Sequence, residues 1–424
     1  MMTSLAALAT AMAVAFAGDT GPPQEARPSP APVPAPALLT LDDALALAAR
    51  HSPHLAAAAA RAEGARNAVP VSGRIPNPLF EGRAENWQFS GDLPQDLRVD
   101  TFLLLSQPLE LGGKRGARRE LAAGDARLAD ASAREIKNAV MVAVASRFLD
   151  AVRWKGVVTI LSVQQDEMRE VTETMRRRVR EGFAAEGDQR KFEAELARVD
   201  NQFLRAQLEL QRALLDLAAL MGTDETLPPD RLVEPASSGS PSPFADLDTL
   251  VERRPDVAAA RARLERAQRA RALEQALAVP DLTLSGGYKR TAGVNTGVAA
   301  VTVPIPWSDR NQAAVARALA EERAAAFDLD GVVRAARADV EAARRTAAGL
   351  VARAATTDEA LIAPAETALR AAVSAFREGA GDILRLVDAE RVYADARRDA
   401  LEIKLDAVLA SVRARLATGE DLVP

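Results

Sequence analysis

The hydrophobic positions of this chain follow a helical period over long stretches that lack proline. No proline stands between Pro108 and Pro228. Within that stretch, apolar residues recur first at steps of four and then at steps of seven: Ile136, Val140, Val144 and Phe148, then Leu196, Phe203, Leu210 and Leu217. Steps of four mark one face of a helix, and steps of seven mark a coiled-coil seam. The pattern predicts two long antiparallel helices, 114–181 and 188–221, with a break between Gly182 and Gly187.

A second pair of long helices is predicted further along, at 309–376 and 383–417. The return helix carries an apolar face at Leu401, Leu405, Val408, Val412 and Leu416. Pro364 interrupts the outgoing helix, and we expect a kink there because proline has no amide hydrogen to donate. A helix spanning 114–181 extends roughly 100 Å at 1.5 Å per residue, which is far more than a compact domain needs.

Each pair of long helices follows a segment with a two-residue period, which predicts a β-hairpin. The hairpins span 79–107 and 281–307, with strands at 79–88, 99–107, 281–291 and 298–307. Alternation over about ten residues, with aromatic residues near the strand ends, is typical of outer-membrane barrels. The aromatic residues in question are Trp87, Tyr288 and Trp307. Taken alone, each segment fits an ordinary soluble hairpin equally well.

Glu81, Arg83 and Glu85 alternate along the first strand and therefore share one face. Charges facing lipid cost about 2–4 kcal/mol at the bilayer midplane, so we expect this face to look into a barrel lumen. Two roles are open for these side chains: they tune ion flow, or they form a hydrated wall. Four antiparallel strands cannot close a barrel, and open sheet edges are not tolerated in lipid. Several chains therefore have to pool their strands.

The order of elements occurs twice, which indicates a tandem duplication. Pro53 to Pro78 and Pro255 to Pro280 are both 25 residues apart, and the string Arg-Glu-Gly at 180–182 recurs at 377–379. From the glycine of each string to the next helix-closing glycine, Gly222 or Gly419, is again 40 residues. The predicted organisation is repeat 1 at 40–222, a linker at 223–243, repeat 2 at 244–420 and a tail at 421–424.

The N-terminal residues 1–17 have the pattern of a signal peptide. Leu5 to Ala17 is an apolar stretch apart from Thr10, and Ala15-Phe16-Ala17 fits an A-x-A cleavage site. No Lys or Arg precedes the stretch, which departs from the usual pattern. The following residues, 18–39, are rich in Pro and Ala and predict an extended spacer. No later segment has eighteen uninterrupted apolar residues, so no transmembrane helix is expected.

Composition narrows the possible functions. Apolar residues make up 48% of the chain and aromatic residues 4%, as suits long, closely packed helices. There is no cysteine, and the formal charge of −5 gives no reason to expect nucleic-acid binding. His51 and His54 are spaced like metal ligands, but a turn at a helix start is favoured over a metal site. Gly112-Gly113-Lys114 lacks the Ser or Thr of a phosphate loop. We find no catalytic set and expect neither enzymatic activity nor a cofactor.

Several strings, taken in order, resemble the TolC-type outer-membrane efflux proteins. The strings are Pro76-Asn77-Pro78, Gln107-Pro108-Leu109-Glu110-Leu111-Gly112-Gly113-Lys114-Arg115, Arg254-Pro255-Asp256-Val257, Val303-Pro304-Ile305-Pro306, Phe376-Arg377-Glu378-Gly379 and Leu386-Val387-Asp388-Ala389-Glu390-Arg391. The resemblance covers residues 40–420, and the string at 107–115 is most similar to the CzcC branch, which serves heavy-metal efflux. It implies a mainly α-helical chain whose four strands join a homotrimeric, twelve-stranded outer-membrane β-barrel, continued by a periplasmic α-helical barrel.

The resemblance also implies roles for particular residues. The turns between long helices form periplasmic tips on which an adaptor protein docks: Arg180, Glu181, Gly182 and Asp188 in the first, and Arg377, Glu378, Gly379 and Asp382 in the second. The family places aperture carboxylates six and nine residues after the second tip glycine, where this chain has Arg385 and Asp388. Asp388 fits and Arg385 departs. The alternative is that the two form a surface pair on a helix.

The function expected from these features is a passive exit duct. The chain would conduct substrate, heavy-metal cations above all, from an inner-membrane RND-type pump and a periplasmic adaptor to the exterior of a Gram-negative-type cell. A duct for drug efflux or type I secretion is the alternative within the same class. A soluble periplasmic coiled-coil scaffold or adaptor is the alternative from another class.

Overall fold

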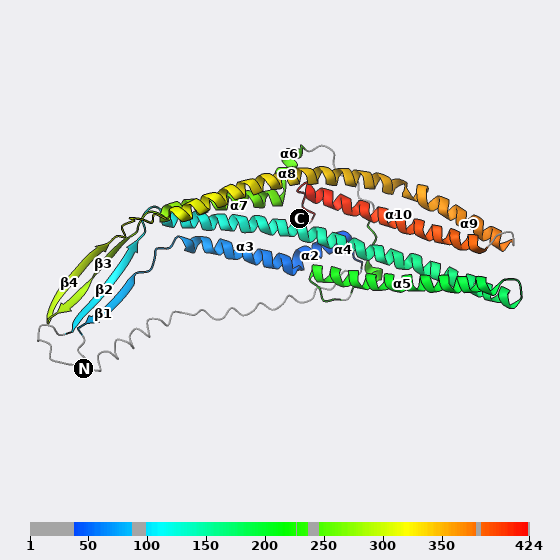
Figure 1. Ribbon diagram of the computed structural model, residues 1–424, viewed down its shortest axis with the longest axis horizontal. Helices are drawn as coiled ribbons and strands as arrows, with labels where there is room; N and C mark the ends of the chain where they lie inside the picture. The colour runs from blue at the N-terminus through cyan, green and yellow to red at the C-terminus, as the bar shows by residue number, and fades with distance from the viewer. Residues whose placement is uncertain (1–37, 87–98, 226, 236–245, 379–382, 423–424) are drawn as a thin grey trace. The chain divides into compact units, whose positions relative to one another are not determined.

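The computed structural model describes residues 38–86, 99–225, 227–235, 246–378 and 383–422 (Figure 1). The predicted signal peptide 1–17 and nearly all of the spacer 18–39 lie outside the described residues. The first copy contains α2 (Leu41–His51), α3 (Pro53–Ser72), β1 (Leu79–Glu85), β2 (Asp100–Leu109), α4 (Lys114–Arg180) and α5 (Glu186–Met221). After the short helix η2 (Pro229–Arg231), the second contains α6 (Leu247–Arg253), α7 (Pro255–Leu277), β3 (Leu282–Thr291), β4 (Val294–Thr302), α8 (Gln312–Thr357), η3 (Asp358–Ile362), α9 (Ala363–Arg377) and α10 (Ile383–Ala417).

The long helices begin and end close to the predicted positions. The helix predicted at 114–181 is α4, and the one predicted at 188–221 is α5, which begins two residues earlier. The helix predicted at 309–376 starts later, at Gln312, and contains η3, a π-helical turn. Pro364 directly follows that turn. Because its nitrogen has no hydrogen to donate, the regular hydrogen-bond ladder is interrupted there.

The strand predicted at 298–307 is placed wrongly. The observed strand, β4, spans Val294–Thr302. It begins early because Ala292 and Gly293, with φ of 49° and 82°, make a tight turn directly after β3. It ends early because Pro304 and Pro306 cannot donate to a neighbouring strand. The first hairpin differs less: β1 ends at Glu85, before Asn86 with a φ of 60°, and β2 runs on to Leu109.

The four strands form one antiparallel sheet in the order β1-β2-β3-β4. The two hairpins join through β2 and β3, where Leu103 pairs with Tyr288 and Leu104 with Gly287. A Cβ at Gly287 would stand 2.0 Å from the carbonyl oxygen of Leu103, so this approach requires glycine. Every residue of β1 is exposed, as is nearly every residue of β4. Among the described residues, β1 and β4 therefore each leave one edge of the sheet without a partner strand.

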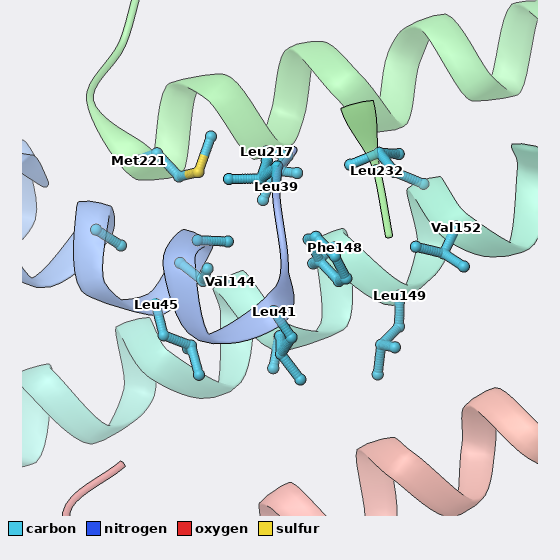
Figure 2. Close-up of a cluster of buried hydrophobic side chains, with 14 of the residues drawn as sticks. Leu39, Leu41, Leu45, Val144, Phe148, Leu149, Val152, Leu217, Met221 and Leu232 are labelled. Atoms are coloured by element: carbon cyan, nitrogen blue, oxygen red, sulfur yellow. The ribbon is translucent and has the colours of Figure 1, made fainter. Parts of the chain in front are cut away.

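Helix α4 is the centre of the helical part, packing against α2, α3, α5, α7 and α10. The largest core cluster joins α2, α4, α5 and α10 around Phe148, Leu217 and Leu405 (Figure 2). Of the eight apolar positions that the four- and seven-residue steps selected, it contains five: Val140, Val144, Phe148, Leu210 and Leu217. Ile136 is partly buried against it, and Leu196 and Phe203 pack against a second cluster. A parallel bridge between Leu39 and Leu232 covers one side of it. Among the described helices, none has a stretch apolar and long enough to cross a bilayer.

Candidate functional site

The turn between α4 and α5 is a compact helix end that exposes an aromatic side chain. Gly182 takes a φ of 80°, and the amide of Phe183 donates to the carbonyl oxygen of Arg178 at 2.8 Å, the pattern of a glycine-closed helix. Phe183 is 80% exposed, and the sequence reasoning did not select it. Arg180 and Glu181 are exposed at the end of α4. Asp188 stands in the first turn of α5 and pairs with Lys191 at 3.2 Å.

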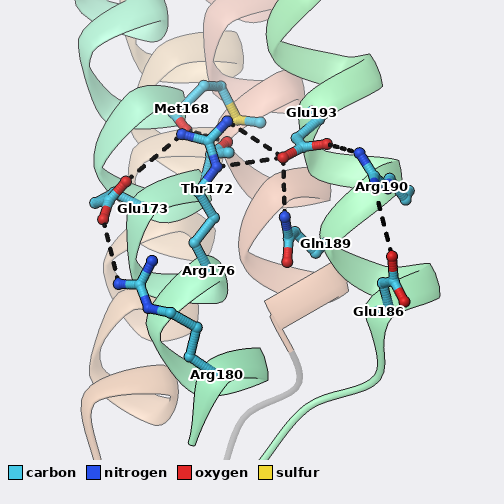
Figure 3. A network of polar contacts seen from close by, with 9 residues as sticks. All are labelled: Met168, Thr172, Glu173, Arg176, Arg180, Glu186, Gln189, Arg190 and Glu193. Carbon is cyan, nitrogen blue, oxygen red and sulfur yellow. Dashed lines mark hydrogen bonds and ion pairs between the residues drawn. The ribbon is translucent and has the colours of Figure 1, made fainter.

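Directly behind this turn, an ion pair joins α4 to α5, and polar contacts within each helix support it (Figure 3). Arg176 of α4 donates to Glu193 of α5 at 3.2 Å, and Gln189 and Arg190 donate to the same carboxylate at 3.0 Å. These donors, with Gln189 first, hold the pKa of Glu193 below its usual range. Arg180 pairs with Glu173 at 3.8 Å. The tip is therefore a braced platform rather than a loose loop.

The second tip is described in part. Glu378 is exposed, and its amide donates to the carbonyl oxygen of Ser374 at 3.0 Å, closing α9. Gly379 and Asp382 lie outside the described residues, as does the side chain of Arg377. The guanidinium of Arg178 lies 4.8 Å from the ring centre of Phe376. This cation–π contact connects the last turns of α4 and α9.

Arg385 and Asp388 lie on the exposed side of the first turns of α10, whereas Leu386 faces the core. Within the described part of the chain, no ion pair joins the two charged side chains. A surface pair between them is therefore not present in a single chain. Both side chains are exposed on the described surface of α10.

One face of the sheet carries a cluster of charged side chains, and the other is mainly apolar but includes Arg290 next to the turn between β3 and β4. Arg83 forms ion pairs with Glu85 at 3.2 Å and with Glu81 at 3.9 Å, so the three predicted lumen residues form one charged cluster. In the strand register, Arg83 of β1 stands opposite Phe102 of β2, which stands opposite Lys289 of β3. Both cations lie over the Phe102 ring, at 4.5 and 5.0 Å from its centre. The opposite face carries Phe80, Leu103, Leu105, Leu284, Tyr288 and Val301.

The predicted interface aromatics differ in their placement. Trp87 lies outside the described residues. Tyr288 stands within β3 rather than at its end, and its hydroxyl donates to Asn295 Oδ1 at 2.6 Å. Trp307 lies beyond the end of β4 and is 89% exposed. The expectation that Trp307 ends a strand is therefore wrong, because β4 stops before Pro304.

An ion pair with a buried lysine joins the sheet to the long helices. Lys114, the first residue of α4, is 4% exposed and donates to Asp281 at 2.6 Å. The amide of Leu111 donates to the same carboxylate at 3.1 Å. Nearby, Arg118 donates to Glu110 at 2.7 Å and to the carbonyl oxygen of Ser72 at 3.1 Å. These contacts connect α3 and α4 to both hairpins where the helices meet the sheet. The sequence analysis placed Lys114 at the start of a helix and in the string at 107–115, and rejected it as part of a phosphate loop, but did not predict this ion pair.

Within the described ranges, no three or more His, Cys, Asp or Glu side chains are arranged to hold a metal ion. His51 ends α2 and His54 lies in the first turn of α3, on either side of the corner that Pro53 makes.

The comparisons with known proteins agree with the resemblance expected from the sequence. The model of the family described as outer membrane efflux protein matches residues 44–223 and 247–420. The cobalt-zinc-cadmium resistance protein CzcC of Cupriavidus metallidurans is 31% identical over 278 residues, which are 65% of this chain and 64% of that protein. The match thus spans less than two thirds of this relative's length.

Solved structures share the fold over nearly the whole chain. The Campylobacter jejuni CmeC outer membrane channel superposes with a TM-score of 0.77 at 16% identity, covering 90% of this chain and 87% of that one. The outer membrane protein VceC from Vibrio cholerae gives a TM-score of 0.71 at 22% identity, covering 90% and 96%. Matched over both of its halves by one family model, the chain belongs to the outer membrane efflux protein family.

Proposed function

We propose that this protein is the outer-membrane exit duct of an efflux system and conducts its substrate passively. The observation that carries the proposal is the sheet. Among the described residues it has a charged face, a mainly apolar face and two edges without a partner strand, and long helical hairpins continue from it. A bilayer tolerates such a sheet only when its edges are paired by other copies.

The assembly that satisfies these edges is a homotrimer with twelve strands in the outer membrane. Its apolar face, with Leu105 56% and Val301 64% exposed in the single chain, would meet lipid. Glu81, Arg83 and Glu85 would line the lumen. The helical hairpins would extend into the periplasm, with Asp388 and Arg385 near the aperture.

The partners in this proposal are a periplasmic adaptor and an inner-membrane RND-type pump. The tip at Arg180, Glu181, Gly182 and Asp188 presents exposed Phe183 on a braced helix end, and an exposed aromatic residue on a rigid support suits docking. The second tip, at Arg377, Glu378, Gly379 and Asp382, would serve a second contact with the adaptor.

The cargo we propose is heavy-metal cations. The support is the 31% identity with a relative whose name is cobalt-zinc-cadmium resistance protein. Deleting the gene should lower tolerance to zinc, cobalt and cadmium, and restoring it should recover that tolerance. Sensitivity to antibiotics with unchanged metal tolerance would instead indicate a drug duct.

A pair of neighbouring substitutions tests the membrane role itself. Leu284 stands on the apolar face of β3, and Ser285 follows it on the charged face, where its hydroxyl lies 2.8 Å from that of Ser106. Leu284→Arg should weaken outer-membrane assembly and metal tolerance, because an arginine facing lipid costs about 2–4 kcal/mol per chain at the bilayer midplane and less toward the interface. Ser285→Arg should retain assembly. Equal tolerance of both substitutions, with the protein washing free of the membrane, would favour a periplasmic scaffold.

A further inference from the structure

A buried carboxyl group lies in the interface between α10 and α4. Glu390 is 7% exposed, and its Oε2 atom has no hydrogen-bond partner. One turn earlier, Leu386 packs in an apolar cluster with Met168 and Val171 of α4. An ionised carboxylate without a partner is unfavourable in such surroundings. The packed arrangement therefore favours the neutral acid.

The charges that act on Glu390 from α4 are negative. Burial is the largest cause that raises the pKa of Glu390, and the carboxylates of Glu167 and Glu170 raise it further, to about 7. Burial also raises the pKa of Glu167, although Arg397 opposes this. Among the described residues, no cation counts among the groups that act on Glu390.

Charged groups on the other elements around α10 have partners of their own. On α5, Glu195 and Arg198 pair with each other and act on Arg391 and Asp395. Further pairs include Glu366 with Arg370 on α9, Glu341 with Arg345 on α8, and Asp358 of η3 with Lys404. The half-buried Glu167 and the exposed Glu170 thus act on Glu390 without a compensating charge from these neighbours.

The interface is open next to this cluster. A cavity of about 310 Å³ lies between α4 and α10, lined in part by Gly156, Thr159, Arg397 and Leu401, and Ile362 of the π turn η3 borders it. The cavity is flanked by an apolar contact of Gly156 with Leu401 and by single polar contacts, Arg398 with Gln164 at 3.2 Å and Arg153 with Asp406 at 2.7 Å. A void and isolated hydrogen bonds resist displacement less than a continuous apolar seam does.

We propose that Glu390 is a proton-dependent latch between α4 and α10. As the neutral acid it allows the two helices to stay packed, and as a carboxylate facing Glu167 and Glu170 it drives them apart. The inference depends on packing within one chain, and it stands or falls separately from the proposed duct function.

The direction of the pH dependence follows from the two states of Glu390. In the separated form its pKa returns to the usual 4.5, whereas in the packed form it is about 7. Between these values the packed form binds more protons, so its stability is fully present below pH 4.5 and is lost as the pH rises through 7. The ratio of separated to packed form should rise about tenfold per pH unit across this window and level off above it.

Spin labels on the full-length protein in detergent test the latch. The chain has no cysteine, so Val163→Cys on α4 and Val392→Cys on α10 give two unique labels; these side chains are 42% and 49% exposed. Excess unlabelled protein keeps one labelled copy per assembly. Electron–electron resonance distances should lengthen between pH 5 and pH 8. With Glu390→Gln added, the short distance should persist at both values.

Two further variants make the result decisive. Glu402→Gln removes an exposed carboxylate from the same helix and should behave like the unmodified chain. Glu167→Gln removes one facing charge without altering the buried residue, so the distance change should be smaller and should level off at lower pH. The latch is overturned if the unmodified chain shows one distance at all pH values, or if Glu390→Gln leaves the pH response intact.

Discussion

In both copies the end of the returning long helix packs against the end of a short helix, and different side chains stabilise this corner. In the first copy, Gly222 ends α5 with a φ of 71° and faces the carbonyl oxygen of His51 at the end of α2. In the second, Gly419 ends α10 with a φ of 76° and faces Arg253 at the end of α6. In both, the next amide donates to a carbonyl oxygen five residues back, at 3.1 Å. The glycine and proline landmarks that recur in the sequence therefore meet in space.

The residue before each proline shows how far the copies have diverged. Ser52 is 1% exposed, and its Oγ atom has no hydrogen-bond partner. Its counterpart Arg254 donates to Asp256 at 2.7 Å and to Asp339 and the carbonyl oxygen of Ala417 at 3.5 Å. One corner is held by apolar packing and the other by an ion-pair network. The comparison teaches that backbone geometry constrains the glycines strictly, whereas the side chain beside them is replaceable.

The largest effect is expected at Gly222. A Cβ there would lie 2.2 Å from the His51 carbonyl oxygen, a backbone atom, whereas at Gly419 the nearest atom is the Arg253 Cβ at 2.9 Å. Gly222→Ala should therefore destabilise the protein by about 3–4 kcal/mol and Gly419→Ala by about 1–2 kcal/mol. Thermal unfolding in detergent compares the two. Equal losses would show that the corners are not constrained as the geometry indicates.

A smaller effect is expected from Arg254→Ala. Burial raises the pKa of Asp256, but the hydrogen bond from Arg254 outweighs it and holds that pKa below its usual range. The pair thus contributes stability above pH 4, and this contribution is lost as the pH falls through the lowered pKa. Arg254→Ala should cost about 2 kcal/mol at pH 7 and less at pH 3. Arg253→Ala, which changes the exposed neighbour, is the matched control, and a loss independent of pH would contradict the ion-pair account.

The smallest effect is expected at Ser52. Its hydroxyl is buried without a partner, so Ser52→Ala removes an unsatisfied polar atom and should be neutral or stabilising by up to about 1 kcal/mol. The counterpart change Arg254→Ala should be destabilising, which makes the sign of the effect the test. Destabilisation by Ser52→Ala would show that the hydroxyl has a structural role.

Much of the fold follows from local sequence signals. Helix bounds were predictable because Gly182 and Gly222 stop helices by their backbone conformation, and Pro53 and Pro255 start them. The start of β4 was missed because Ala292 takes a positive φ, which is not a property expected of alanine.

The site is less predictable because its contacts join distant parts of the chain. The cluster of Arg83 and Lys289 over Phe102 depends on the register of three strands, and Lys114 meets Asp281 across the two copies. Glu390 carries no local signal at all, since its burial is decided by how α10 lies on α4. Alternation selected Glu81, Arg83 and Glu85 as one face, but not the aromatic ring beneath them.

The most direct test of the central claim asks whether the sheet edges pair between copies. Within one chain, β1 and β4 are separated by two strands, at about 4.8 Å per step, too far for a disulfide. One cysteine in β1, at Phe80, Gly82 or Ala84, is combined with one in β4, at Asn295, Gly297 or Ala299. After oxidation in the outer membrane, at least one combination should give covalent trimers on denaturing gels. If all nine combinations stay monomeric, the pooled barrel is contradicted.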